Sequence, residues 1–186
     1  MSLQKPFTVL FEELKIEDVP EAGGKNASLG EMIQMLPGIE IPSGFVVTAS
    51  AYKYFLAETG LGDYIKNELK GLNTKSLDDL QKCGKNIREK IKDTEFPVDL
   101  RDSIINAFKI AEKRYGSGTD FAIRSSATAE DLPEASFAGE QETFLNIRGI
   151  DAILIAVRKC MASLFTDRAI SYRADKGFDH LKIYLS

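Results

Sequence analysis

Residues 121–147 constrain the fold most, because this stretch begins and ends like a strand but is polar and small in its middle. Phe121 to Ile123 suits a sheet, and residues 143–147 return to β-branched, aromatic and aliphatic side chains. The two ends therefore predict a strand, a long loop and a second strand that pairs with the first as a hairpin.

The predicted loop carries groups that suit phosphate oxygens. Arg124 at its root is a permanent cation, and Gly139 permits a close approach of the backbone. Hydroxyl donors are found at Ser125, Ser126, Thr128 and Ser136. Since Ser and Thr are common loop residues, an ordinary hairpin remains an alternative. In that alternative, Arg124 pairs with an acidic neighbour: Glu130, Asp131 or Glu134.

A glycine turn near the N-terminus offers a second set of phosphate donors. Gly23-Gly24-Lys25 precedes a predicted helix with one buried face, indicated by the i, i+3, i+4, i+7 spacing of Leu29, Met32, Ile33 and Leu36. The N–H groups and dipole of a helix N-terminus favour an anion, and Lys25 adds a full positive charge. The motif is not a Walker A loop. By itself it also fits a plain helix entry, because glycine is common in such turns.

Composition is that of a globular chain. Its 186 residues suffice for one well-buried core or two small lobes, and 44% hydrophobic with 28% charged residues is ordinary. The net charge of −4 argues against a general binder of nucleic acid or of membrane surfaces. Neither a run of about 20 apolar residues nor the apolar core of a signal peptide is present, which predicts a cytoplasmic protein.

The other segments predict short strands among many helices. Residues 9–11 indicate a short strand, and residues 41–48 indicate a turn followed by another short strand. Thr48 is the predicted N-cap of a helix whose Tyr52 and Phe55 belong to the core. Residues 60–115 are mainly helical and carry no chemical motif. Cys83 and Cys160 lie in predicted helices without metal-ligand spacing, so both are expected to be reduced thiols.

The C-terminal third predicts two helices and a strand. Residues 150–165 have one apolar side, and residues 166–176 continue as a helix until Gly177. Arg168 and Arg173 either face a ligand or form ion pairs with the nearby Asp167 and Asp175. Residues 181–186 alternate like a strand and then stop, which predicts a truncated element.

Three segments together resemble the nucleotide-binding domain of the phosphoenolpyruvate synthase family, which includes pyruvate phosphate dikinase and rifampin phosphotransferase. They are Ala22-Gly-Gly-Lys-Asn-Ala-Ser-Leu-Gly-Glu-Met32, the run from Arg124 to Pro133, and Ser136-Phe-Ala-Gly-Glu-Gln-Glu-Thr143. The resemblance implies an α+β fold: the first lobe of an ATP-grasp domain, with a small mixed sheet flanked by helices and truncated at the C-terminus. Residues 1–186 are then the N-terminal ATP-binding lobe, with residues 60–115 as a helical insertion or subdomain.

The resemblance also implies a ligand and its contacts. ATP is the expected ligand, and its predicted contacts are Lys25, Arg124, Gly139, Thr143 and, as a further candidate, Arg168. The ligands of Mg²⁺ are expected in the second lobe, and pyruvate and phosphoenolpyruvate are expected to bind through further domains. Glu140 stands where many relatives have glutamine, so no contact is assigned to it.

The family's full enzymes move a phosphoryl group from ATP to a histidine and then to pyruvate. The single histidine, His180, lies in Gly-Phe-Asp-His, which is unlike the family's phosphohistidine segment, so no catalytic residue is assigned. The chain alone is therefore not expected to complete the reaction. A rifampin phosphotransferase or dikinase relative and a non-catalytic nucleotide-binding module remain alternatives.

Overall fold

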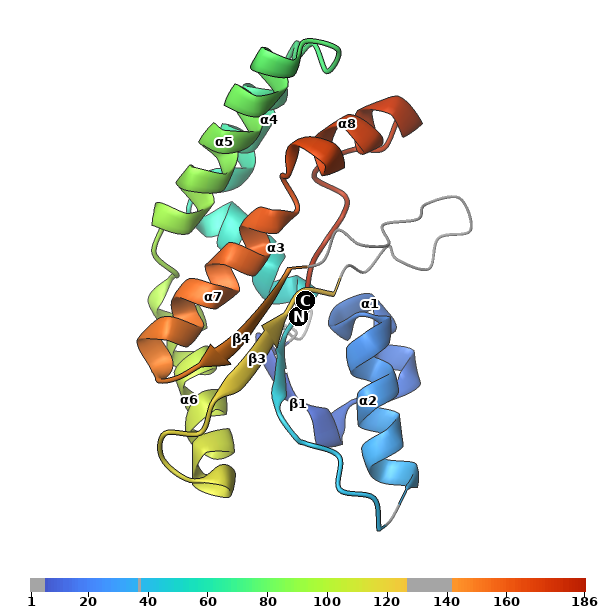
Figure 1. The fold of residues 1–186 in the computed structure, drawn as a ribbon, viewed down its shortest axis with the longest axis vertical. Coiled ribbons are helices and arrows are strands. Elements are labelled where there is room, and N and C mark those ends of the chain that lie inside the picture. Colours follow the sequence, from blue (N-terminus) through green and yellow to red (C-terminus); the bar gives the residue numbers. More distant parts are fainter. Residues whose placement is uncertain (1–5, 37, 127–141) are drawn as a thin grey trace, which may run out of the picture.

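The computed structural model describes residues 6–36, 38–126 and 142–186, in which helices surround two short β-sheets (Figure 1). Strand β1 (Thr8–Leu10) pairs antiparallel with β2 (Phe45–Val47), and β3 (Phe121–Arg124) pairs antiparallel with β4 (Thr143–Ile147). The predicted α+β class is confirmed. The predicted single mixed sheet is wrong for these residues, because each described strand finds only one partner and that partner is antiparallel.

The N-terminal unit is built on helix α2 (Gly24–Met35), which follows β1, two 3₁₀ turns (Phe11–Glu13 and Ile16–Asp18) and α1 (Val19–Ala22). Small residues form its packed side: Ala27 is fully buried, and a Cβ on Gly30 would lie 2.6 Å from Leu14 Cβ. Gln34 Nε2 donates to Leu14 O at 2.7 Å from the same side.

The buried face predicted for α2 is wrong in part: Leu29 and Ile33 are half-buried, but the other two residues of the pattern are not. Met32 and Leu36 are exposed, because the close approach of α2 to the first 3₁₀ turn requires the small residues Ala27 and Gly30 on the packed side.

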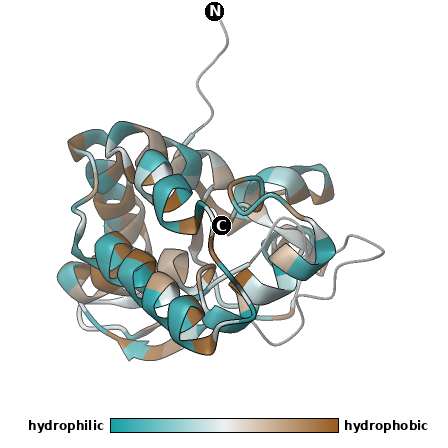
Figure 2. Cartoon of the chain, turned by 90° about the horizontal axis from the view of Figure 1, so that it is seen from above, coloured by the Kyte–Doolittle hydropathy of each residue, from teal (hydrophilic) through white to brown (hydrophobic). Residues whose placement is uncertain are grey.

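Four helices follow β2: α3 (Ala49–Glu58), α4 (Leu61–Leu69), α5 (Leu77–Asp93) and α6 (Val98–Tyr115). The predicted N-cap of α3 is confirmed, since Thr48 Oγ1 accepts from Ala51 N at 3.1 Å. In Figure 2, hydrophilic and hydrophobic residues alternate along the helices, as an amphipathic pattern requires. No helix among the described residues is long and apolar enough to cross a membrane.

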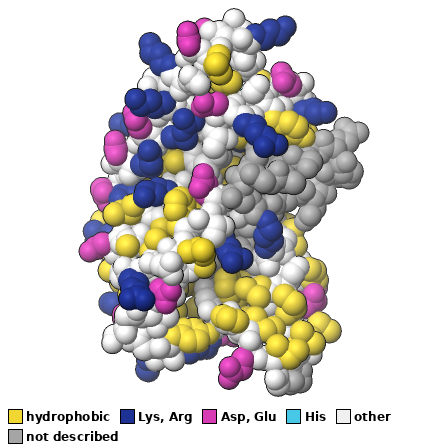
Figure 3. Space-filling model, in the orientation of Figure 1, with side chains coloured by type: hydrophobic (Ala, Val, Ile, Leu, Met, Phe, Trp, Pro, Cys, Tyr) yellow, Lys and Arg dark blue, Asp and Glu magenta, His cyan; other side chains and the backbone are white. Residues whose placement is uncertain are grey.

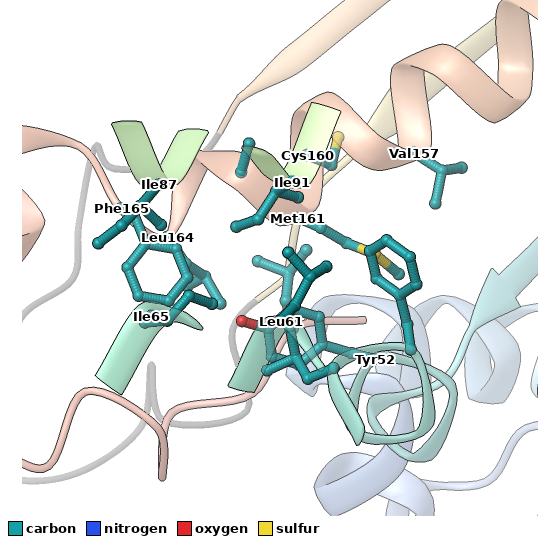
Figure 4. Close-up of a cluster of buried hydrophobic side chains, with 14 of the residues drawn as sticks. Tyr52, Leu61, Ile65, Ile87, Ile91, Val157, Cys160, Met161, Leu164 and Phe165 are labelled. Carbon is teal, nitrogen blue, oxygen red and sulfur yellow. The ribbon is translucent and has the colours of Figure 1, made fainter. Parts of the chain in front are cut away.

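The main core joins these helices to α7 (Ile150–Ser163), and a part of it is drawn in Figure 4. Its fully buried side chains include Tyr52, Phe55, Ile65, Ile87, Leu100, Ile104, Ile153 and Phe165. Both cysteines are buried free thiols, as predicted, and burial raises the pKa of Cys160 to about 12. The hairpin rests on this core, because the ring of Phe121 lies 5.6 Å from that of Phe108 in α6.

The chain ends with α8 (Asp167–Lys176) and an irregular segment that returns to β3. The strand predicted for residues 181–186 is wrong for most of this segment, because a turn takes up its start and strand-like pairing is limited to a bridge at Leu185. Asp179 Oδ1 accepts from Leu181 N at 2.9 Å, and Asp179 O accepts from Lys182 N at 3.1 Å. These local bonds compete with strand pairing.

Candidate functional site

The glycine turn before α2 lies directly against the end of β3. Gly23 is the N-cap of α2 with φ 75° and ψ 154°, and a Cβ placed on it would lie 2.2 Å from Ser126 Oγ. Only glycine fits this contact. Lys25 follows Gly23 by two residues and Arg124 precedes Ser126 by two, so both residues lie close to this contact along the chain. We call this contact the glycine–serine junction.

The C-terminal residue holds the junction together. Ser126 and Ser186 exchange two backbone hydrogen bonds, each of 2.9 Å. The hydroxyl of Ser186 donates to Ala22 O, and Asn26 Nδ2 donates to the same carbonyl at 2.7 Å. The sequence did not predict the roles of Ser186 and Asn26, because these roles depend on contacts between distant segments. The one available signal was the position of Asn26 in the first turn of α2, where polar side chains often bond to the backbone.

The hairpin brings two predicted contacts face to face. Arg124 and Thr143 are directly paired across β3 and β4, and both are exposed. On the opposite face, Ile123 and Phe144 are paired and pack against the core. Residues on one face of an antiparallel pair lie close together, so a single ligand can reach both Arg124 and Thr143.

The two serines after Arg124 have different roles. Ser125 Oγ accepts from Glu142 N at 3.1 Å, so this hydroxyl fastens the hairpin. Ser126 is 2% exposed, and its Oγ has no hydrogen-bond partner among the residues that the structure describes. An unpartnered buried hydroxyl costs about 1–3 kcal/mol.

Two predictions for the loop lie outside the described residues. They are the phosphate contact of Gly139 and the pairing of Arg124 with Glu130, Asp131 or Glu134. Within the described part of the chain, Arg124 has no ion pair.

The two arginines of α8 differ in surroundings. Arg168 is exposed, and Figure 1 shows α8 apart from α2, so Arg168 is not grouped with the glycine–serine junction. Arg173 is buried: its Nε donates to His180 Nδ1 at 3.1 Å, and its guanidinium lies 5.3 Å from the ring centre of Phe165. Burial, followed by the charge of Arg173, lowers the pKa of His180 to about 4, so this histidine is neutral at pH 7.

A depression of about 540 Å³ lies elsewhere, between α5, α7 and the start of α8. Its lining includes Lys92, Lys159 and Phe144 but none of the five predicted ATP contacts. Phe144 and Thr143 point to opposite faces of β4, so the depression and Thr143 lie on different sides of the hairpin.

The described residues contain no group of three His, Cys, Asp or Glu side chains that could hold a metal ion. Mg²⁺ prefers several oxygen ligands, and the described residues do not bring enough carboxylates together to supply them. No step is therefore assigned to a metal held by these residues.

The fold defines an α+β domain in which the N-terminus of α2 meets a buried serine at the end of β3. The chain belongs to the family described as pyruvate phosphate dikinase, AMP/ATP-binding domain, whose model matches residues 19–186. This confirms the resemblance on which the sequence prediction rested.

Three phosphoenolpyruvate synthases illustrate the similarity. The protein of Aquifex aeolicus is 54% identical over 96% of this chain, which covers 21% of the relative. The protein of Synechocystis sp. is 50% identical over 95% of the chain, which covers 22% of the relative. For Escherichia coli the identity is 46% over 97% of the chain, which covers 23% of the relative. The chain thus spans about a fifth of the length of these curated relatives.

Proposed function

We propose that the chain binds the phosphates of ATP at the glycine–serine junction and belongs to an enzyme of the phosphoenolpyruvate synthase type. In that enzyme, a phosphoryl group passes from ATP through a phosphohistidine to pyruvate. The observation that carries the proposal is the contact of Gly23 with Ser126, because it joins the family's two phosphate motifs and leaves a buried hydroxyl unpartnered. The domain that it forms is the first lobe of an ATP-grasp unit.

Charge neutralisation and positioning are the main tasks in phosphoryl transfer, because ATP carries about four negative charges. The free amides at the start of α2 and its dipole face the junction, and Lys25 extends from its first turn. Arg124 and Thr143 approach from the paired strands, with Arg124 as a cation and Thr143 as a hydroxyl donor. Gly139 is proposed to let the loop backbone approach the same phosphates.

The remaining steps are proposed to need residues outside this chain. The phosphohistidine is assigned to a further domain, because His180 lies in a sequence context unlike the family's phosphohistidine segment and its Nδ1 already accepts from the buried Arg173 at 3.1 Å. Mg²⁺ ligands, pyruvate and phosphoenolpyruvate are assigned to the further domains. Arg168 stays a candidate contact that a closing second lobe would bring into reach, and the cytoplasm is the proposed compartment.

Removing either flanking cation is expected to weaken ATP binding. Lys25→Ala and Arg124→Ala should each raise the dissociation constant for ATP about tenfold or more, which corresponds to about 1.4 kcal/mol of lost binding free energy. Isothermal titration calorimetry with Mg-ATP measures the effect. Matched controls are Arg148→Ala, just after β4 on the same hairpin, and Lys82→Ala on α5. Equal affinities for all four variants would contradict the proposal.

Ser126→Ala separates a ligand contact from a structural role. The free energy of unfolding without ATP should stay constant or rise by up to about 1 kcal/mol, because the variant loses a buried hydroxyl that has no partner among the described residues. Affinity for ATP should fall severalfold, because the ligand loses one donor. Urea unfolding and calorimetry measure the two quantities. A variant that is less stable without ATP and binds ATP normally would show that the hydroxyl serves the fold.

A further inference from the structure

Helix α2 has apolar residues on both of its sides; one side is packed, and the other is only partly covered, with Leu29 and Ile33 half-buried. Its packed side consists of Ala27, Gly30 and Gln34, which contact the residues before α1. A helix of 3.6 residues per turn places Met32 and Leu36 on the opposite side. These two side chains are 43% and 41% exposed.

Further large apolar side chains extend this exposed surface. Met35 is 69% exposed, and Ile39, whose amide donates to Leu36 O at 3.3 Å, is 62% exposed. We call Met32, Met35, Leu36 and Ile39 the α2 patch. Figure 3 shows hydrophobic side chains gathered over the part of the molecule where α2 ends. Monomeric soluble proteins rarely expose contiguous apolar patches larger than a few hundred Å².

The residues left exposed include those whose spacing predicts burial. Met32 and Leu36 belong to the i, i+3, i+4, i+7 pattern that normally faces a core. In this chain, however, the small residues of α2 meet the core instead. A helix that is apolar on both sides is typical of a helix covered on both sides. The pattern therefore fits a partner that packs on the α2 patch.

We infer that the α2 patch docks against a domain that the longer relatives possess in addition to the region matched here. This chain corresponds to only 21–23% of three such relatives, so most of their length remains to supply a cover. Figure 1 places α2 at the margin of the molecule, where another domain can reach it without disturbing the main core. Removing apolar side chains from water is favourable, which favours such docking. The inference does not depend on nucleotide binding.

Methionine oxidation tests the inference directly, because peroxide converts exposed thioethers to sulfoxides. The 186-residue chain is compared with a polypeptide of the relatives' full length that carries the same residues, and the products are quantified by mass spectrometry. Met32 and Met35 should oxidise about tenfold more slowly in the longer polypeptide. Met161, which is 2% exposed, is the internal control and should react slowly in both. Equal rates for Met32 and Met35 in the two proteins would overturn the inference.

Charged substitutions give an independent test in the longer polypeptide. Met35→Asp and Ile39→Asp should lower its melting temperature and restore rapid oxidation of Met32, while leaving the stability of the 186-residue chain nearly unchanged. Leu77→Asp and Val98→Asp are matched controls, since these residues are 64% and 65% exposed on other helices. The opposite result is a dimer of the 186-residue chain at high concentration that slows the oxidation of Met32 and that Met35→Asp dissociates. That result would assign the α2 patch to a second copy of the chain and refute the inference.

Discussion

Gly23→Ala is expected to lower the free energy of unfolding by about 3 kcal/mol and to remove ATP binding. The backbone at Gly23, with φ 75° and ψ 154°, is a conformation nearly restricted to glycine, and forcing another residue into it costs about 1–3 kcal/mol. The new Cβ would also lie 2.2 Å from Ser126 Oγ and 2.9 Å from Ser126 Cβ. Separating these atoms costs about 1–3 kcal/mol more and opens the junction. Urea unfolding and ATP titration measure both effects.

Gly149→Ala is the matched control for this prediction. Gly149 is the N-cap of α7 with φ 78° and ψ 156°, almost the backbone conformation of Gly23, but a Cβ there meets nothing within 4 Å. Gly149→Ala should therefore lower the free energy of unfolding only by the cost of the strained backbone, and it should leave ATP binding intact. Ser126→Gly should partly rescue Gly23→Ala, because it removes both clashing atoms. Equal losses for the two alanine variants, without rescue, would contradict a tight contact between Gly23 and Ser126.

Local patterns in the sequence were sufficient for most individual elements. The hairpin was predicted because β-branched and aromatic residues stand at both ends of residues 121–147, and α3 because Thr48 precedes its first turn. The pattern did not predict which side of α2 packs. The periodicity follows the spacing of the large apolar side chains. The close approach of α2 to the first 3₁₀ turn depends instead on the lack of a Cβ at Gly30.

The candidate site was less predictable because it depends on contacts between distant segments. Family resemblance supplied Lys25 and Arg124, but no spacing in the sequence shows that Gly23 meets Ser126. Ser125 and Ser126 look equivalent in the sequence. Neighbouring residues of an extended chain point to opposite sides, so the structure assigns one hydroxyl to the hairpin and leaves the other at the junction.

The two arginines of α8 also look alike in sequence and differ in the structure. Arg168 is exposed, whereas Arg173 is 1% exposed and links three segments. It donates from Nη2 to Leu164 O, at the C-terminal end of α7, and from Nε to His180 Nδ1 at 3.1 Å. A cation at a helix C-terminus also interacts favourably with the helix dipole. Arg173 thereby fixes the final segment, whose Ser186 closes the glycine–serine junction.

Arg173→Met is expected to destabilise the chain by about 3–5 kcal/mol, because it removes two hydrogen bonds from a buried charged donor, each of which contributes about 1.5–3 kcal/mol. Methionine fills much of the volume, but it leaves Leu164 O and His180 Nδ1 without this donor. Chemical unfolding gives the change in free energy. Because His180 is the single histidine, its NMR titration is unambiguous, and its pKa should rise from about 4 toward 6.5 while burial keeps it below that value.

The control for Arg173 is Arg168→Met on the same helix, which should change the free energy of unfolding by less than about 1 kcal/mol, because interactions of exposed charges are screened by solvent. The loss of unfolding free energy for Arg173→Lys should lie between those of Arg173→Met and Arg168→Met. Lysine keeps the charge, but it cannot donate in two directions from a planar group. An Arg173→Met protein as stable as the unmodified chain, with an unchanged pKa of His180, would mean that Arg173 does not hold the final segment. In that case the placement of Ser186 at the glycine–serine junction would need another cause.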